Sequence, residues 1–278
     1  NQSGAAYFWK KGEKMQNGNL KTPIEGVILD WAGTAVDHGC RGPVAVFSRA
    51  FERFGIEPTI GECRKPMGLA KRAHVAAMLD MPRINEAWLA ARGKRPDDRD
   101  VDLVFDVVGE IMPAVLADYA KPVPGCVEAI RKLRQMGIKI GSCTGYSRSM
   151  MSELLPKARA CGFEPDCLVT TDEVEKGRPA PDMCRLNCER LGLKNPGAVI
   201  KVGDTLADIG EGLNAGHITV AVTITSNSLG LGEEEAAAMP RTELDAKCAE
   251  LAKKFREAGA HYVLDSIADL PDLCAKLS

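Results

Sequence analysis

Short apolar runs that alternate with amphipathic stretches constrain the fold of this chain more than any other feature of its sequence. The amphipathic stretches have helical periodicity and cover residues 127–136, 150–160, 182–191 and 206–214. The apolar runs have the length of single strands and cover residues 26–30, 138–144, 167–171, 198–204, 218–224 and 261–265. This alternation is typical of a parallel sheet covered by helices. The sequence therefore predicts an α/β fold with a parallel-sheet, Rossmann-like core.

The stretch between the first predicted strand and the rest of the sheet has a different pattern. Its helical patterns cover residues 44–54, 70–79, 84–91 and 102–117, and a Pro- and Gly-containing turn follows at residues 121–125. We expect a helical cap domain at residues 38–121, inserted after the first strand of a core formed by residues 23–37 and 122–278. Residues 1–22 are polar, and we expect them to form a poorly ordered N-terminal extension.

Charge, apolar runs and cysteine spacing limit the class of partner. A net charge of -2 over 278 residues gives no basic surface for nucleic acid. No run approaches the roughly 20 apolar residues that a membrane span requires. The ten cysteines include no C-x-x-C pair, which favours free thiols in a reducing cytoplasm over disulfides or zinc sites. We therefore expect a cytoplasmic protein that binds a small molecule, with neither nucleic acid nor membrane as a partner.

Polar residues stand where three of the predicted strands end. Asp30 ends the first strand, Thr144 the second and Asp204 the fourth, and Asp208 follows four residues later. Each is ordinary alone, because an Asp after a strand is most often a helix cap or a turn residue. At one edge of a parallel sheet, however, the carboxylates converge, and their repulsion favours a hard divalent cation such as Mg²⁺. Thr144 and the cation of Arg178 would then bind a phosphoryl group.

These segments resemble the four sequence motifs of the haloacid dehalogenase superfamily. The resemblance implies that Asp30 is a nucleophile that takes up phosphorus and forms an aspartyl phosphate. It also implies that Mg²⁺ is the cofactor, bound by Asp30, the backbone carbonyl of Ala32 and Asp204, with support from Asp208.

Two positions depart from the superfamily motifs. Ala32 stands where phosphatases have an Asp that protonates the leaving oxygen, and Arg178 stands where Lys is usual, with Lys176 nearby as a less favoured substitute. Without the acid, an enzyme that expels an alkoxide would lose about 10²–10⁴ in rate. Ala32 therefore speaks against a phosphate ester as the substrate.

One segment of the predicted cap, residues 64–74, has the basic sequence RKPMGLAKRAH. Taken alone it predicts a turn and an amphipathic helix with Lys71 and Arg72 in solvent. Beside the sequence DWAGT at residues 30–34, it closely resembles the phosphonoacetaldehyde hydrolase family. The resemblance extends from about residue 24 to the C-terminus.

The resemblance to phosphonoacetaldehyde hydrolases assigns roles on both sides of the site. It implies that Lys71 forms a Schiff base with the substrate aldehyde and that the enzyme is a homodimer. The residues implied to surround this lysine and the substrate are Cys40, Met67, His74 and Tyr146. The residues implied to bind the phosphoryl group are Thr144, Gly145, Arg178 and Trp31, the last through its backbone N–H.

A Schiff base would explain why no acid is needed at position 32. A C–P bond does not break to release a bare carbanion, but an iminium accepts the electron pair and yields an enamine. Lys71 must be neutral to attack, and we expect Arg72, His74 and a closed cap to lower its pKa. The resemblance thus implies hydrolysis of phosphonoacetaldehyde. Two alternatives stay open: a related phosphonate or a phosphate ester as the substrate, or a catalytically silent protein that binds phosphorylated metabolites.

Overall fold

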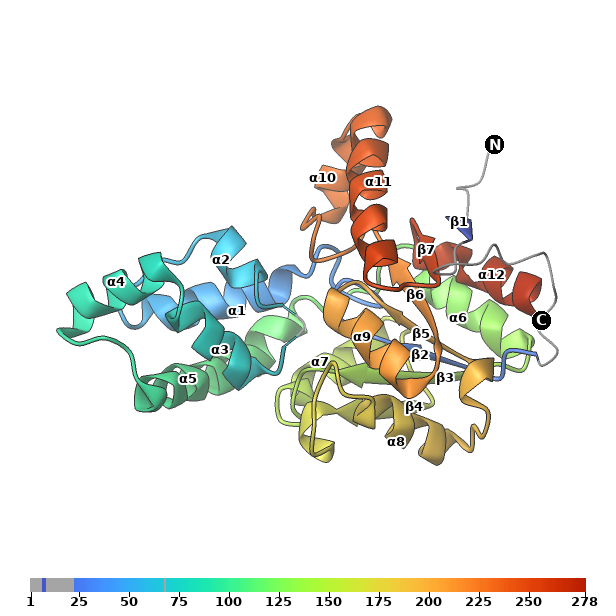
Figure 1. Cartoon of the computed structure of the whole chain (residues 1–278), viewed down its shortest axis with the longest axis horizontal. Coiled ribbons are helices and arrows are strands. Elements are labelled where there is room, and N and C mark those ends of the chain that lie inside the picture. Colours follow the sequence, from blue (N-terminus) through green and yellow to red (C-terminus); the bar gives the residue numbers. More distant parts are fainter. Residues whose placement is uncertain (1–6, 9–22, 68) are drawn as a thin grey trace.

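The computed structural model describes residues 7–8, 23–67 and 69–278, and a seven-stranded sheet forms its centre (Figure 1). The strand order is β1-β7-β6-β5-β2-β3-β4. Strands β2 to β7 are parallel, and β1 pairs antiparallel with β7. The strands are β1 (Tyr7–Phe8), β2 (Gly26–Leu29), β3 (Lys139–Thr144), β4 (Cys167–Thr170), β5 (Val199–Gly203), β6 (Ile218–Val222) and β7 (Tyr262–Leu264).

The parallel strands β2 to β7 lie where the sequence predicts them, which confirms the α/β core. Strand β1 is a difference, because Tyr7 pairs with Val263 and Phe8 with Tyr262. Both residues belong to the segment predicted to be an extension outside the fold, since a strand of two residues has no periodicity that the sequence could reveal. The remaining residues of that extension, and Gly68 of the cap segment, lie outside the described residues.

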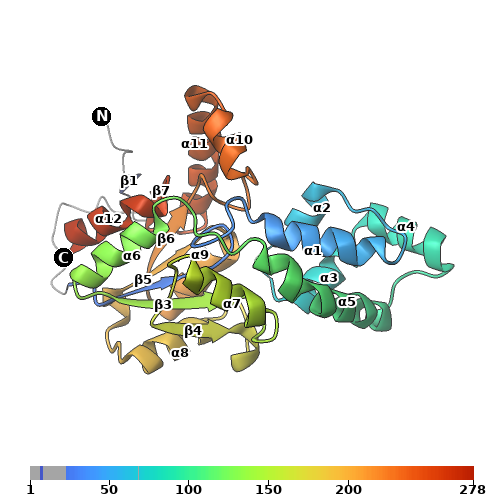
Figure 2. The ribbon, with the colours of Figure 1, turned by 180° about the vertical axis from the view of Figure 1, so that it is seen from behind.

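Helices cover both faces of the sheet, as the buried parallel strands require. Side chains of β2 alternate between the faces, so Leu29 packs in one buried cluster and Ile28 in another. The helices on the Leu29 face are α6 (Cys126–Gln135), α7 (Met151–Ala160) and α12 (Leu270–Leu277). Those on the other face are α8 (Asp182–Leu191), α9 (Leu206–Ala215) and α11 (Arg241–Glu257). A short helix, α10 (Glu233–Ala238), precedes α11, and both stand out from the core in Figures 1 and 2.

The segment after β2 forms a helical cap at one side of the sheet (Figures 1 and 2). Its helices are α1 (Arg41–Glu52), α2 (Ile60–Arg64), α3 (Lys71–Leu79), α4 (Pro82–Arg92) and α5 (Asp98–Ala117). Helices α1 and α5 pack along each other around an interior built from Phe47, Phe51, Met78, Trp88 and Val104. The helical insertion after the first strand is therefore confirmed, although the first cap helix begins at Arg41 and not at Val44.

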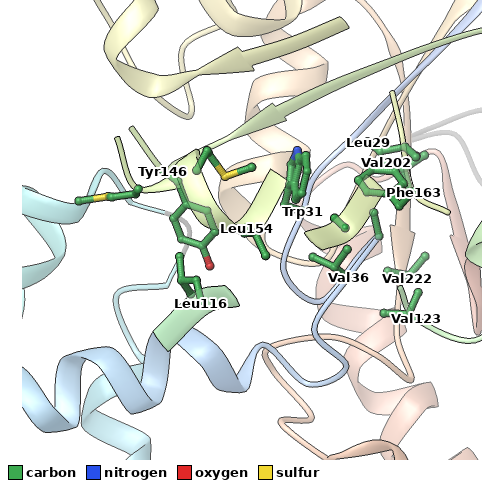
Figure 3. Packing of buried hydrophobic residues seen from close by; sticks show 14 of the residues in the cluster. Leu29, Trp31, Val36, Leu116, Val123, Tyr146, Leu154, Phe163, Val202 and Val222 are labelled. Atoms are coloured by element: carbon green, nitrogen blue, oxygen red, sulfur yellow. The ribbon is translucent and has the colours of Figure 1, made fainter. Parts of the chain in front are cut away.

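The apolar interiors of the core and the cap are continuous. One buried cluster contains Leu29 and Trp31 of the core together with Phe47 and Leu116 of the cap. Figure 3 shows Tyr146, which follows β3, pointing toward Leu116 of α5. The loop after β3 therefore contacts the cap directly.

All ten cysteines are free thiols, and seven of them are buried. Within the described ranges, no helix is both long and apolar enough to cross a membrane.

Candidate active site

The central strands bring the predicted strand-end residues together. Strand β2 lies between β3 and β5, so Asp30, Thr144 and Asp204 meet at the carboxyl edge of three neighbouring strands. Ligands of open α/β sheets bind at this kind of topological switch point. A cavity there is lined from the core by Asp30, Ala32, Thr144, Gly145, Tyr146, Arg178, Asp204 and Thr205. The cap completes it with Cys40, Pro43, Met67, Leu69 and Lys71.

Three buried carboxylates lie at the floor of this site. Oxygens of Asp30, Asp204 and Asp208 lie within 4.8 Å of one another. Burial, with the nearby charges of Asp30 and Asp208, raises the pKa of Asp204 well above its ordinary value. Burial also raises the pKa of Asp30, although Arg178 opposes this shift. A bound divalent cation would reverse both effects, so the donor set fits Mg²⁺.

The turn after β2 packs against the Asp204 carboxylate and fixes its orientation. Gly33 has a φ of +85°, and a Cβ on this residue would lie 2.4 Å from Oδ2 of Asp204. Only glycine allows this approach in that backbone conformation. Thr34 Oγ1 then donates to Asp204 Oδ1 at 3.2 Å, and the backbone N–H of Asn227 donates to Asp204 Oδ2 at 2.7 Å.

A capping box at the start of α9 orients Asp208. The Thr205 hydroxyl accepts from the Asp208 N–H, and the Asp208 carboxylate accepts from the Thr205 N–H and hydroxyl. A Cβ on Gly203 would lie 2.2 Å from the Cβ of Asp208, so the strand must end in glycine here. The sequence pattern GDTxxD therefore fixes this carboxylate through ordinary helix capping.

Arg178 connects three acidic residues beneath the cavity. Its guanidinium donates to Asp30 Oδ1 at 2.7 Å and to Glu211 Oε2 at 2.8 Å, and lies 3.1 Å from Asp208 Oδ1. Arg178 is buried, whereas Lys176 is exposed, so Arg178 is the cation that reaches the strand ends. Its contact with Asp30 orients the carboxylate that faces the cavity.

Two residues of this network, Lys201 and Glu211, are absent from the set predicted from the sequence. Lys201 Nζ lies 2.8 Å from Asp208 Oδ1 and 3.4 Å from Glu211 Oε2. Burial alone would raise the pKa of Asp208, but Arg178 and Lys201 outweigh it and hold the pKa at about 2. A signal for both existed: Lys201 interrupts the apolar strand β5, and Glu211 follows Asp208 by one helical turn.

Lys71, at the start of α3, is the cap's charged group in the cavity. It is 6% exposed, its Nζ lies 4.8 Å from the centre of the Tyr146 ring, and it has no ion pair among the described residues. Burial is the largest cause that lowers its pKa to about 8; Cys40 and Asp30 oppose this shift, and Arg178 acts in the same direction as burial. The reading of Lys71 as a solvent-exposed helix residue is therefore wrong.

The expected contribution of Arg72 to that pKa is also wrong. Arg72 is exposed, and its Nε donates to Asp102 at 2.7 Å on the cap surface. Its charge is thus turned away from the cavity, and the cation that acts on Lys71 is Arg178 of the core.

The residues expected around Lys71 fall into two groups. Cys40, Met67 and Tyr146 line the cavity, and burial raises the pKa of both the Cys40 thiol and the Tyr146 hydroxyl well above ordinary values. His74 lies behind Lys71, with its ring stacked on Phe47 at 3.8 Å between centroids and Nε2 placed 2.9 Å from the Cys63 carbonyl. Burial lowers the pKa of His74 well below its usual value, so the ring is neutral.

Two buried polar atoms near Lys71 have no hydrogen-bond partner among the described residues. They are the Tyr146 hydroxyl oxygen and Nδ1 of His74. Such atoms are rare in protein interiors and are usually satisfied by a ligand or water. Tyr146 is a cavity-lining residue, and its hydroxyl points toward Leu116 of the cap (Figure 3).

Trp31 and Gly145 complete the predicted set. The Trp31 side chain is fully buried, donates from its indole N–H to Ser142 Oγ at 3.2 Å, and meets Phe163 edge to face at 5.0 Å (Figure 3). Its side chain is therefore a packing element behind the site. Gly145 lines the cavity, and a Cβ there would lie 3.5 Å from the Leu69 carbonyl oxygen of the cap.

The entry to the cap contains a further residue that the sequence analysis missed. Asp37 accepts from the backbone N–H groups of Arg41 and Gly42, at 2.9 Å each, and so satisfies the start of α1. Burial raises its pKa to about 7. Cys40 lies between Asp37 and Arg41 in the sequence and has a φ of 51°. The hydrogen bonds from Arg41 and Gly42 to Asp37 support this left-handed conformation.

This chain is similar to known proteins. The family model of haloacid dehalogenase-like hydrolases matches residues 24–216. A phosphonoacetaldehyde hydrolase of Nitratidesulfovibrio vulgaris is 49% identical over 89% of this chain and 88% of its own length. One of Bacillus cereus is 45% identical over 90% of this chain and 95% of its own.

A solved structure agrees with the sequence relatives. The crystal structure of a phosphonoacetaldehyde hydrolase-like protein from Oleispira antarctica has a TM-score of 0.90 and 37% identity, and the match covers 95% of this chain and 96% of that one. The similarity includes both the core and the cap, since it spans nearly the whole chain. The chain is an enzyme of the haloacid dehalogenase-like hydrolases and belongs, within them, to the phosphonoacetaldehyde hydrolase family.

Proposed function

We propose that this enzyme hydrolyses phosphonoacetaldehyde to acetaldehyde and phosphate, through a Schiff base on Lys71 and an aspartyl phosphate on Asp30. One observation carries the proposal: a buried lysine without an ion pair among the described residues lines the same cavity as Asp30. Ala32, which lines that cavity as well, offers no proton to a leaving oxygen. The names of the relatives support the substrate.

We propose that Mg²⁺ is held by Asp30, Asp204 and, as the family resemblance implies, the backbone carbonyl of Ala32, with Asp208 in support; the three carboxylates lie close enough together to share one cation. When bound, the cation would neutralise the carboxylates and the charge on the phosphoryl oxygens. Asp208 is already engaged by Lys201, Arg178 and Thr205, which favours a supporting role for it.

The first step joins the substrate to the cap. Neutral Lys71 Nζ attacks the aldehyde carbon, and loss of one water gives an iminium after proton transfer. Cys40 and Tyr146 line the cavity beside this amine, and the Tyr146 hydroxyl has no hydrogen-bond partner among the described residues, so we assign both residues proton transfer or the positioning of water. We assign His74 the positioning of α3, because its neutral ring packs behind Lys71 and not in the cavity.

The second step transfers phosphorus to the core. A carboxylate oxygen of Asp30 bonds to phosphorus while the C–P bond breaks, and the electron pair of that bond moves into the iminium to form an enamine. No leaving oxygen needs a proton, which is why Ala32 can replace the usual acid. Thr144, Arg178 and the N–H groups of Trp31 and Gly145 stabilise the phosphoryl oxygens.

The final steps release both products. The enamine carbon takes up a proton, and water hydrolyses the resulting imine to acetaldehyde and free Lys71. A second water hydrolyses the aspartyl phosphate on Asp30. One water leaves in the first step and two are consumed here, so the sum is hydrolysis by one water. Met67, at the cavity wall, packs its thioether beside the enamine.

Product analysis tests this function. The purified enzyme with Mg²⁺ and phosphonoacetaldehyde should release acetaldehyde and phosphate in a one-to-one ratio, and phosphate esters of simple alcohols should react far more slowly. Comparable rates on both substrates would favour a phosphatase. Binding without release of phosphate would favour a silent module.

Three further expectations belong to this proposal. We place the enzyme in the cytoplasm, which ten free thiols support, and we retain the homodimer that the family resemblance implies. We also propose that residues 38–121 form the cap domain and that residues 23–37 and 122–278 form the core domain.

A further inference from the structure

Arg64, a cap residue outside the cavity, donates hydrogen bonds to backbone carbonyl oxygens of the core. Arg64 ends α2, and its Nη1 donates to the carbonyls of Gly39 at 2.6 Å and Asn227 at 3.0 Å. The same nitrogen lies 3.2 Å from Asn227 Oδ1, and Nη2 donates to the Gly230 carbonyl at 3.1 Å. Asn227 returns a contact from Nδ2 to the Arg64 carbonyl at 3.4 Å. The guanidinium therefore bridges the cap, its entry and the core loop after β6.

The hydrogen bonds of Arg64 to Gly39, Asn227 and Gly230, here called the clasp, hold the guanidinium by geometry and not by charge. It has no ion pair among the described residues, and the acceptors of its guanidinium are carbonyl oxygens. A planar guanidinium presents donors in a fixed fork, so several acceptors hold it in one orientation. Gly230 has a φ of +66°, and a Cβ there would lie 2.6 Å from Arg64 Cζ, so the loop is shaped closely around the fork.

The two ends of this clasp lead to the two halves of the site. On the core side, Asn227 is buried and its backbone N–H donates to Oδ2 of Asp204 at 2.7 Å. On the cap side, Arg64 precedes Met67 by three residues and Lys71 by seven in one continuous segment. The Gly39 carbonyl stands immediately before Cys40, which also lines the cavity. Arg64 thus connects the loop that orients Asp204 to the segment that delivers Lys71.

We propose that Arg64 is a positioning residue, which holds the Lys71-bearing segment of the cap in register with the Asp204-bearing edge of the core. This proposal rests on the proposed function. Misplacement of reacting groups by about 1 Å can lower a rate by about 10²-fold. Loss of the clasp should therefore slow the phosphorus transfer, which needs both halves, more than the imine step, which needs mainly the cap.

The first test compares Arg64→Gln and Arg64→Lys with the control Arg53→Gln. Arg53 is an exposed cap arginine whose 2.8 Å ion pair with Glu110 stays inside the cap. We expect Arg64→Gln to lower kcat for phosphonoacetaldehyde by about 10- to 100-fold, Arg64→Lys to lower it less, and Arg53→Gln to leave it unchanged. In the same samples, borohydride should label Arg64→Gln on Lys71 to nearly the wild-type extent.

The pattern of losses distinguishes positioning from a structural role. A merely unfolded fraction would reduce phosphate release and borohydride labelling equally, and that result would overturn the proposal, as would unchanged kcat in Arg64→Gln. If wild-type enzyme neither releases phosphate nor is labelled, the proposed function fails instead.

A double-mutant cycle tests the contact between Arg64 and Asn227 of the core loop. Its outcome does not depend on the stability of any single variant. Asn227→Ala removes Oδ1 and Nδ2 but keeps the N–H that reaches Asp204. If the two residues act as one unit, Arg64→Gln with Asn227→Ala should lower kcat/KM no more than about 2-fold beyond the larger single effect. Arg53→Gln with Asn227→Ala should give the product of its single effects. Multiplicative losses in the first pair would contradict the clasp.

Discussion

The core and the cap each bury a lysine near the active site, and the two lysines have opposite surroundings. In the core, Lys201 lies 2.8 Å from Asp208 and 3.4 Å from Glu211. Burial alone would lower its pKa, but these carboxylates hold the pKa well above the ordinary value. In the cap, Lys71 is also buried but has no ion pair among the described residues, and its pKa falls to about 8.

This difference in pKa suits Lys201 to a structural role as a permanent cation and Lys71 to a role as a nucleophile. Lys201 stays charged and neutralises the carboxylates that the strand ends bring together. Lys71 can lose its proton near pH 8, because burial outweighs the opposing influence of Asp30 and no described residue forms an ion pair with it. In the proposed mechanism the cap therefore contributes a nucleophilic amine, and the core contributes a fixed acceptor for phosphorus.

The largest expected effect comes from removing the acceptor in the core. Asp30→Asn should lower phosphate release by about 10⁴-fold or more, because the amide cannot take up phosphorus. If core and cap act separately, borohydride should still trap the imine in this variant. Activity above a trace, once deamidation back to Asp has been excluded by mass spectrometry, would point to another nucleophile.

Removal of the metal should act on the core alone. Treatment with EDTA should lower turnover by about 10²-fold or more, since a bound cation supplies several kcal/mol of charge stabilisation. Added Mg²⁺ should restore the rate. Turnover that persists undiminished in the chelator would contradict a metal role for the carboxylate cluster.

The two lysines should differ in their effect on stability. Lys201→Met leaves Asp208 and Glu211 with less compensation, so the free energy of unfolding should fall by about 3 kcal/mol or more. Lys71→Met removes a buried amine without an ion pair, so stability should change by less than about 1 kcal/mol or increase. Urea unfolding of both variants measures this difference. Equal losses would show that the surroundings of the two lysines matter less than we infer.

Much of the core site could be predicted because its signals are local. Strand ends place Asp30, Thr144 and Asp204, and a capping box places Asp208. The clasp could not be predicted, because Arg64 and Asn227 are 163 positions apart and neither belongs to a periodic pattern. Local pattern also misplaced the charge near Lys71, since Arg72 is its neighbour in sequence while Arg178 is its neighbour in space.

A smaller effect is the pH dependence of the cap chemistry. Only the neutral amine attacks the aldehyde, and the pKa of Lys71 is lowered to about 8. The rate of imine formation should therefore rise about tenfold per pH unit below that pKa and level off above it. Rapid-quench trapping with borohydride across pH 6 to 9.5, roughly spanning the expected pKa, measures the profile. A rate that rises up to about pH 10.5, the range of an ordinary lysine, would contradict the role of burial.

Borohydride trapping followed by peptide mapping tests the central claim most directly, namely that Lys71 is the imine-forming amine. With phosphonoacetaldehyde present, borohydride should inactivate the enzyme irreversibly and leave one secondary-amine adduct, on Lys71 and not on Lys201. Lys71→Arg keeps the charge but cannot form the imine, so it should be both inactive and unlabelled. An adduct on Lys65 or Lys176, or cleavage of the C–P bond by Lys71→Arg, would contradict the assignment of Lys71.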